Sequence, residues 1–211
     1  PWRERVGAIL QAWYPGQEGG RAIAEIIAGK VNPSGRLPVS FPASLEHWPR
    51  RELPGLGLPA RTAITVDYPE GSDIGYLRLA RRGEAPLFAF GHGLGYTRFE
   101  YSGLRLVARD PVTLEFSVQN VGARAGEDVP QLYLVGRDEE RLQRLVGFER
   151  VTLQPGASRR LRMALDDRLL GEYASGGWQR PAGRYRFALG HSAVELGAPL
   201  EARLTAKRRA P

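Results

Sequence analysis

The sequence predicts a β-sandwich preceded by the C-terminal end of an α/β domain. Two features of the 211 residues predict this arrangement. In the second half of the chain, several short runs alternate apolar and polar residues and are separated by turn residues, which is typical of strands. In the first 41 residues, an apolar run leads through a proline-glycine turn into a segment with the apolar spacing of an amphipathic helix. We therefore expect two regions of different architecture.

The first region contains the stretch AWYPGQEGG at residues 12–20. We interpret residues 9–13 as the edge of a buried strand and Pro15-Gly16 as a tight turn. A helix then opens, because the apolar residues at positions 22, 23, 26 and 27 share one face of a period near 3.6, and Gly29 ends it. A crossover helix of this kind is typical of an α/β sheet.

A turn cluster follows at residues 32–35 and leads into a second strand predicted over 36–41. One helix and two strands cannot bury both faces of a sheet by themselves, so they are expected to complete a larger sheet. From residue 42 to about residue 95 the chain is rich in proline and glycine, and we expect a long connection draped over other structure. The predicted boundaries are 1–60 for the end of the α/β domain, 61–95 for a linker that edges a functional site, and 96–211 for the sandwich.

The sandwich is predicted from a series of short strands that follow Tyr96. They are placed at 113–118, 129–135, 145–151, 158–165, around Trp178, at 185–189 and at 201–205. Seven or so strands with turns between them favour a β-sandwich of the immunoglobulin or fibronectin type III kind. Its expected core is Leu106, Leu114, Phe116, Val118, Leu132, Leu134, Phe148, Leu161, Met163, Tyr185 and Phe187.

The composition excludes several classes of function. The net charge of +7 points to nucleic acid as a partner, but the arginines are scattered and no nucleic-acid-binding motif accompanies them, so we expect no nucleic-acid binding. No apolar run approaches the roughly 20 residues that span a bilayer, so no membrane partner is expected. The absence of cysteine excludes disulfides and thiolate sites, and the three histidines lack metal-ligand spacing. We predict no metal and no cofactor.

Six segments together resemble glycoside hydrolase family 3, the β-glucosidase and β-xylosidase group. They cover most of the chain in the family's order, and as a set they are highly specific. The segments are AWYPGQEGG at 12–20, GKVNPSGRLPVSFP at 29–42, YPEGSDIGY at 68–76, PLFAFGHGLGYTRFEY at 86–101, VQNVGARAGEDVPQLYL at 118–134 and LVGFERVTLQPGASRRL at 145–161.

The resemblance implies a three-part enzyme: a (β/α) barrel, an α/β sandwich domain and a fibronectin type III-like domain. This chain would hold the end of the second part and all of the third, with the upstream barrel and α/β domains as its partners. The family's retaining mechanism uses an aspartate nucleophile and a glutamate acid/base that lie upstream of AWYPGQEGG. We therefore assign no catalytic residue to this chain and expect it to be inactive alone, because that chemistry requires both carboxyl groups.

Four residues are candidates for binding a β-linked oligosaccharide or glucoside. Trp13 and Tyr14 would offer aromatic faces to a pyranose ring, although a tryptophan after an apolar run is more often a core residue. Glu18 would accept hydrogen bonds from sugar hydroxyls, whereas a structural glutamate there would stabilise the helix N-terminus. Glu70 lies three residues before Asp73, and the pair is either an acid/base dyad or, as we favour, part of a loop that anchors itself.

Because the chain begins with Pro1 and runs at once into apolar sequence, we expect it to be a fragment or a processed piece. A periplasmic or secreted location is favoured over a cytoplasmic one, and the sugar and the linkage stay open. The alternative function is a non-catalytic sandwich module that binds carbohydrate or protein. Such a module has no need of residues 1–41, which separates the two interpretations.

Overall fold

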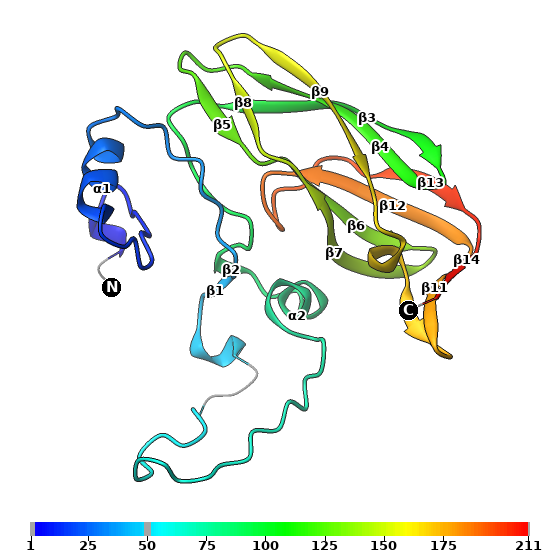
Figure 1. The fold of residues 1–211 in the computed structure, drawn as a ribbon, viewed down its shortest axis with the longest axis horizontal. Coiled ribbons are helices and arrows are strands. Elements are labelled where there is room, and N and C mark those ends of the chain that lie inside the picture. The colour runs from blue at the N-terminus through cyan, green and yellow to red at the C-terminus, as the bar shows by residue number, and fades with distance from the viewer. Residues whose placement is uncertain (1–2, 49–51, 211) are drawn as a thin grey trace.

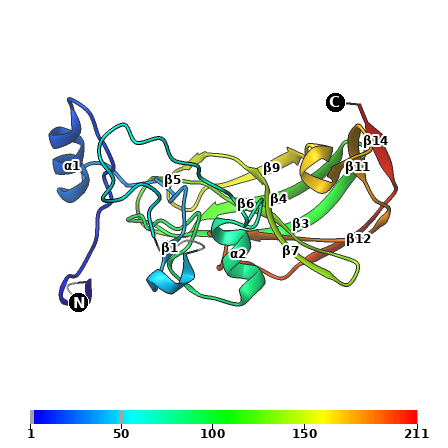
Figure 2. The same ribbon diagram turned by 90° about the horizontal axis from the view of Figure 1, so that it is seen from below.

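The protein is described here by a computed structural model that covers residues 3–48 and 52–210. A β-sandwich forms its main body, and the preceding residues run along one side of it as short elements joined by extended segments (Figure 1). In Figure 1 the two sheets of the sandwich lie one above the other, and in the view from below they overlap (Figure 2). In the described ranges, no helix is long and apolar enough to cross a membrane.

The sandwich is built from two main antiparallel sheets. The three-stranded sheet has the order β3-β4-β9, with β3 at Phe99–Arg109, β4 at Val112–Asn120 and β9 at Ser158–Ala164. The four-stranded sheet has the order β13-β12-β6-β7, with β13 at Leu200–Leu204, β12 at Gly183–Gly190, β6 at Gln131–Arg137 and β7 at Glu140–Phe148. The edge strands are therefore β3 and β9 in the first sheet and β13 and β7 in the second.

Smaller sheets complete the fold. At one end β5 (Gly126–Asp128) pairs with β8 (Val151–Leu153), and at the other β10 (Glu172–Ala174), β11 (Gly177–Arg180) and β14 (Lys207–Arg209) form three strands beside the 3-10 helix η3 (Asp167–Leu170). Both small sheets are antiparallel.

Register places the apolar residues of both sheets in one core. In β4 and β9, Leu114 pairs with Met163 and Phe116 with Leu161, and all four side chains are buried. This follows from the period of two, because alternate residues of a strand share a face. The core confirms most of the predicted residues; Leu106 is half-buried against it, and Phe148 is the exception, since it ends β7 with 65% of its surface exposed.

The predicted strands after Tyr96 are confirmed with small shifts, but the first strand was not foreseen. The strand β3 contains Gly103 and several charged residues, and it departs from regular register between Ser102 and Arg105. These interruptions hide the alternation that reveals the other strands. The predicted strand at 145–151 is in fact the end of β7 followed by β8.

Before the sandwich, the predicted helix is confirmed as α1 (Gly19–Ile27), whereas both predicted strands are wrong in this structure. Residues 9–13 form no strand, since no described strand lies beside them to share hydrogen bonds. The strand predicted at 36–41 is reduced to β1 (Phe41–Pro42), which pairs with β2 (Pro86–Phe88). Strand propensity alone does not make a strand without a neighbour.

Three short helices complete this half: η1 (Arg3–Arg5), η2 (Leu45–His47) and α2 (Gly75–Arg82). None of the three was predicted. The helix α2 is the longest of them. It ends at Gly83 in the left-handed conformation and packs against β7 of the sandwich (Figure 1). The segment between residues 52 and 74 loops away from the body and lies below α2 in Figure 1.

Candidate functional site

The two aromatic candidates lie just before α1 and are open to solvent. Trp13 is 49% exposed and adopts φ 52°, and its ring stacks on Phe41 with 6.3 Å between centroids. Tyr14 is 99% exposed. The expectation that the tryptophan is a core residue is therefore wrong for this chain: one side of the Trp13 ring packs on Phe41 and about half of the residue is exposed, whereas Tyr14 is almost fully exposed.

The contact of Trp13 begins a series of rings that reaches the sandwich side of the molecule. Phe41 meets Phe88 edge to face at 6.2 Å, and Phe88 stacks on His92 at 5.8 Å. His92 is a packed turn residue in this structure, because its carbonyl also accepts a hydrogen bond from the Leu37 amide at 2.9 Å. No periodicity joins these residues in the sequence, so the series could not be predicted.

Glu18 directly precedes α1, and its side chain makes no capping hydrogen bond. Its carbonyl accepts the first helical bond, from Ala22, at 3.0 Å. The carboxylate thus adds only its charge to the helix N-terminus, where a negative charge is favourable, and its oxygens stay available.

Glu70 lies in the turn before α2, and its carbonyl accepts a hydrogen bond from the Asp73 amide at 3.0 Å. The Asp73 carboxylate is held by Arg81 and lies 3.7 Å from Arg78. Because two guanidinium groups neutralise Asp73, the geometry favours an anchored loop over an acid/base dyad. No contact in the described ranges joins Glu70 to Trp13, Tyr14 or Glu18.

A second polar centre, which we name the Arg36–Asp128 clamp, joins the first half of the chain to the sandwich. Arg36 forms an ion pair with Asp128 and donates to the Gly93 carbonyl at 2.6 Å, and the Tyr101 hydroxyl donates to the other Asp128 oxygen at 2.5 Å. The Asp128 side chain is fully buried and that of Arg36 is 14% exposed. Burial and the Asp128 charge raise the pKa of Tyr101 well above its ordinary value, so the hydroxyl stays protonated as a donor.

Two further hydrogen bonds lie beside the clamp, one to the residue before β5 and one to β5 itself. Asn32 donates to the Ala125 carbonyl at 3.1 Å, and Ser34 donates to Glu127 at 3.1 Å. Arg150 forms an ion pair with Glu127, which lowers the pKa of that carboxyl below its usual value. The NPSGR stretch is therefore a docking segment for β5.

Glycines of the GHGLG stretch allow this close approach. A Cβ at Gly91 would overlap the Gln131 side chain, and a Cβ at Gly93 would overlap the Gly35 carbonyl. The Gln131 amide also donates to the Gly91 carbonyl at 3.0 Å. These glycines do more than form turns, since they let two segments of backbone touch.

The helix α2 is fixed to the outer face of the four-stranded sheet through one tyrosine. The Tyr76 hydroxyl accepts a hydrogen bond from the Leu145 amide at 3.0 Å. Its ring stacks on Phe90 at 4.6 Å and meets Tyr133 edge to face at 6.1 Å. The half-chain before the sandwich is thus tied to it at three places: the clamp, the glycine contacts and Tyr76.

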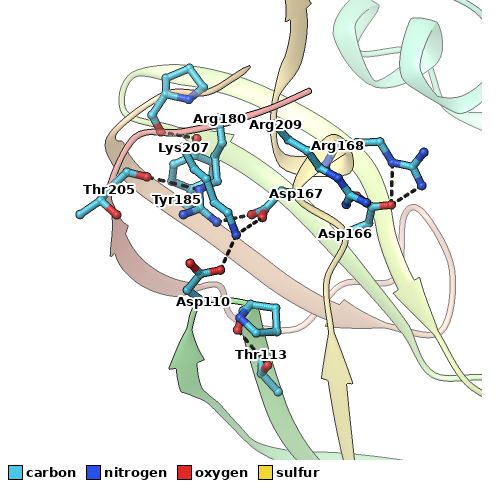
Figure 3. A network of polar contacts seen from close by, with 12 residues as sticks. Asp110, Thr113, Asp166, Asp167, Arg168, Arg180, Tyr185, Thr205, Lys207 and Arg209 are labelled. Carbon is cyan, nitrogen blue, oxygen red and sulfur yellow. Dashed lines mark hydrogen bonds and ion pairs between the residues drawn. The ribbon is translucent and has the colours of Figure 1, made fainter. Parts of the chain in front are cut away.

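A third polar network lies at the opposite end of the sandwich (Figure 3). Lys207 of β14 forms ion pairs with Asp110 and, at 2.7 Å, with Asp167, and the buried Arg180 pairs with the same Asp167. Asp110 holds the pKa of Lys207 above its usual value. This network fastens the last strand, and its acids and bases neutralise one another, so it is not arranged for proton transfer.

The part of the chain that the structure describes contains no group of three or more histidine, aspartate or glutamate side chains that could hold a metal ion. The four candidate residues offer two aromatic rings and two carboxylates. They suit binding and positioning.

The architecture defines a class: a fibronectin type III-like sandwich to which the last part of an α/β domain is attached. A family model for the glycosyl hydrolase family 3 C-terminal domain matches residues 1–96, and one for the fibronectin type III-like domain matches residues 128–193. The chain belongs to glycoside hydrolase family 3 and corresponds to the C-terminal part of its β-glucosidases.

Individual relatives agree with this placement. Beta-glucosidase B of Emericella nidulans is 38% identical over all of this chain, and thermostable beta-glucosidase B of Acetivibrio thermocellus is 35% identical over 93% of it. The chain spans 27% of the length of each. The structure of beta-glucosidase 3B from Thermotoga neapolitana in complex with glucose matches the whole chain with a TM-score of 0.84 and 31% identity, over 30% of its own length.

Proposed function

We propose that this chain acts as the C-terminal part of a retaining, exo-acting β-glucosidase-like enzyme. In that role it completes the α/β sandwich domain and supplies the fibronectin type III-like domain. The match to β-glucosidases over the entire chain carries the proposal, because a free-standing sandwich module would not share residues 1–41 with them. The substrate is a small β-glucoside or β-linked oligosaccharide, from which a terminal sugar is removed.

The catalytic carboxyl groups of such an enzyme lie in the barrel and in the upstream part of the α/β domain. A retaining mechanism needs two carboxyl groups about 5–5.5 Å apart across one sugar. The acidic pair considered from the sequence, Glu70 and Asp73, does not suit the role, since Asp73 is already neutralised by arginines. The chain therefore contributes to binding and positioning.

We assign the edge of the sugar site to Trp13, Tyr14, Glu18 and Glu70. The exposure of both aromatic rings supports this assignment, because an open ring face packs well against the apolar face of a pyranose. The free carboxylate of Glu18 suits a sugar hydroxyl as a hydrogen-bond acceptor. On this basis residues 1–60 end the α/β domain, residues 61–95 connect the two domains and border the site, and residues 96–211 form the sandwich that supports them.

The sandwich holds the segments before it in place. The Arg36–Asp128 clamp and the glycine contacts hold residues 32–36 and 91–95 against the sandwich, so the sandwich fixes the segment that leads from α1 to β1. A small displacement of positioning residues strongly reduces catalytic rate. We expect the sandwich to act on catalysis through this rigidity.

The test compares two proteins, the 211-residue chain and a full-length enzyme that contains it, on aryl β-glucosides. The full-length enzyme should release the aryl alcohol with retention of anomeric configuration, and the chain alone should release none above background. Turnover by the isolated chain that persists through stringent purification would show that the catalytic pair lies in these residues.

The edge residues are tested in the full-length enzyme. Trp13→Ala and Glu18→Gln should raise KM more than they lower kcat, because both act on ground-state and transition-state binding alike. Tyr173→Ala, which removes an exposed ring on β10, is the matched control and should leave KM unchanged. An equal effect of all three variants would contradict the assignment.

A further inference from the structure

A segment with the sequence of a strand lies outside the sheets of the described structure. Residues 62–68 have the sequence TAITVDY, and five of the seven are β-branched or aromatic, the residue types that favour strands. The larger apolar residues, Ile64, Val66 and Tyr68, are two positions apart, so in an extended chain they share one face. This alternation is typical of a strand that buries one face. We call these residues the 62–68 segment.

The backbone of the 62–68 segment is unpaired at its centre. No described strand includes the segment, and it contains no turn or bend. Among the described residues, the amides and carbonyls of residues 63–66 form no hydrogen bond. The segment lies in the loop below α2 in Figure 1, away from the two sheets of the sandwich. Unpaired backbone groups in an extended segment are a template for another strand.

The apolar face of the segment is open to solvent. The exposed fractions of Ile64, Val66 and Tyr68 lie between 36% and 73%. The turns that precede the segment do not cover this face, because their own large apolar side chains are exposed as well: Leu53, Leu56 and Leu58. The segment therefore has both an apolar face to bury and backbone groups to pair.

The preceding turns hold the segment in a defined position. They are closed by backbone hydrogen bonds of 3.1–3.2 Å between residues 53 and 62. Ile64 lies against the first turn, since a Cβ added at Gly55 would be only 3.0 Å from its Cδ1 atom. A segment that is already positioned loses less conformational entropy when it pairs.

Two partners could supply the missing strand: a second copy of this chain, or the rest of a longer protein. A seven-residue strand is only about 23 Å long, and two strands alone are marginally stable. Stable complexes between separate molecules bury roughly 1,200–2,000 Å², far more than two such strands share. Within one protein the connection raises the effective concentration of the partner, so a small contact is sufficient. The size of the segment therefore favours a partner in the same protein.

The relatives provide room for such a partner. Beta-glucosidase B of Emericella nidulans matches the whole chain, the 62–68 segment included, yet the chain spans 27% of its length. We propose that the 62–68 segment adds a strand to an open sheet edge in the part of the full-length enzyme that precedes these 211 residues. This inference rests on the function proposed above, because it needs an enzyme of which this chain is the C-terminal part.

Hydrogen exchange followed by mass spectrometry tests the pairing in the full-length enzyme and in the 211-residue chain. The amides of residues 62–68 should exchange at least about tenfold more slowly in the full-length enzyme, because paired strand amides open rarely. Residues 112–120, which form β4 within the sandwich, are the internal control and should exchange at the same rate in both proteins.

Two proline variants of the full-length enzyme, Thr65→Pro and Val66→Pro, test the strand geometry. Successive amides of a strand point to opposite sides, so only one of the two prolines removes a hydrogen bond to the partner. That variant should speed exchange of the remaining segment amides about fivefold, which corresponds to one hydrogen bond, and the other should change it little. Thr65→Ala and Val66→Ala are the matched controls, because they account for the loss of each side chain.

Three results would overturn the proposal. They are equal exchange of residues 62–68 in the two proteins, equal effects of the two prolines, and protection that appears only as the protein concentration rises, which would identify a second copy as the partner. Turnover of an aryl β-glucoside is measured on the same full-length sample. Turnover without protection overturns the strand pairing alone, whereas protection without turnover supports the pairing and contradicts the proposed function.

Discussion

At the scale of single residues, Asp128 is a fully buried charge with two partners. It receives Arg36 on one oxygen and Tyr101 on the other, and no part of it reaches solvent. A carboxylate can stay buried and charged only while it is paired, because an isolated charge in the interior is strongly unfavourable.

The first prediction concerns this residue. Asp128→Ala should lower the free energy of unfolding by about 3–5 kcal/mol, because it leaves the mostly buried Arg36 guanidinium without a charged partner. Chemical denaturation of both proteins measures the difference. Asp166→Ala, which breaks a more exposed pair with Arg168, should lower the free energy of unfolding much less. Equal decreases for the two variants would mean that the buried clamp stabilises the fold no more than an exposed ion pair does.

The second prediction concerns Gly91, which adopts φ +80° beside the Gln131 side chain. Gly91→Ala should cost about 3 kcal/mol, since it adds both a left-handed strain and an overlap with Gln131. Gly156 adopts φ +75° in a turn with open space around it, so Gly156→Ala should cost only about 1 kcal/mol. Thermal unfolding of the two variants separates the overlap from the strain.

Residue identity predicted the sandwich core well but did not predict the Arg36–Asp128 clamp. Leu114, Phe116 and Tyr185 were foreseen because strand period fixes which residues face inward. Asp128 and Arg36 were not foreseen as partners, because they lie 92 positions apart and nothing local links them. For Trp13 the local sequence was misleading: its neighbours are apolar, which predicts burial, yet the residue is 49% exposed in this structure.

At the scale of elements, the outer face of the β3-β4-β9 sheet is organised around one carboxylate. Glu115 of β4 contacts Arg105 of β3 and Arg160 and Arg162 of β9, so it links all three strands. The hydrogen bonds from Arg105 and then Arg162 lower the pKa of Glu115 below its usual value of 4.5.

The third prediction follows from the sign of that shift. A carboxyl group whose pKa is lower in the folded state stabilises the fold above its unfolded pKa, and this stabilisation is lost as the pH falls through the folded pKa. The stability difference between the parent chain and Glu115→Gln should thus be constant near neutral pH and shrink below about pH 4.5. Urea unfolding at a series of pH values checks this. A difference that does not change with pH would show that Glu115 acts by packing alone.

Elements were predictable where local spacing and tertiary contacts agree. The helix α1 and most sandwich strands satisfy both conditions. The helix α2 was missed because its sequence GYLRLARR lies between proline-rich stretches, and its stability depends on Tyr76 and on packing against β7. The strand β3 was missed because of its bulges.

At the scale of the whole molecule, exposed apolar surface gathers in the half before the sandwich. Tyr14, Ile27 and Leu45 are between 72% and 99% exposed; Tyr14 precedes α1, Ile27 ends it and Leu45 begins η2. Large exposed apolar patches mark surfaces that other parts of a protein cover. This agrees with the proposal that residues 1–60 complete a larger α/β domain.

The fourth prediction is that the 211-residue chain associates with itself and binds a hydrophobic dye. Changing Ile27 and Leu45 together to lysine should reduce both properties, measured by sedimentation and dye fluorescence, because it breaks the apolar surface. Changing Val194 on the sandwich, which is 60% exposed, should have little effect. A monomeric parent chain without dye binding would contradict the account.

The Arg36–Asp128 clamp restricts how enzymes of this kind can be recombined. Its two halves lie in different matched regions, residues 1–96 and residues 128–193, yet neither charge is tolerable in the interior alone. A chimera that takes its sandwich from another relative should therefore fold only if the donor supplies an acid opposite the recipient's arginine. In protein engineering, a crossover between two relatives should therefore be placed so that Arg36 and Asp128 come from the same parent.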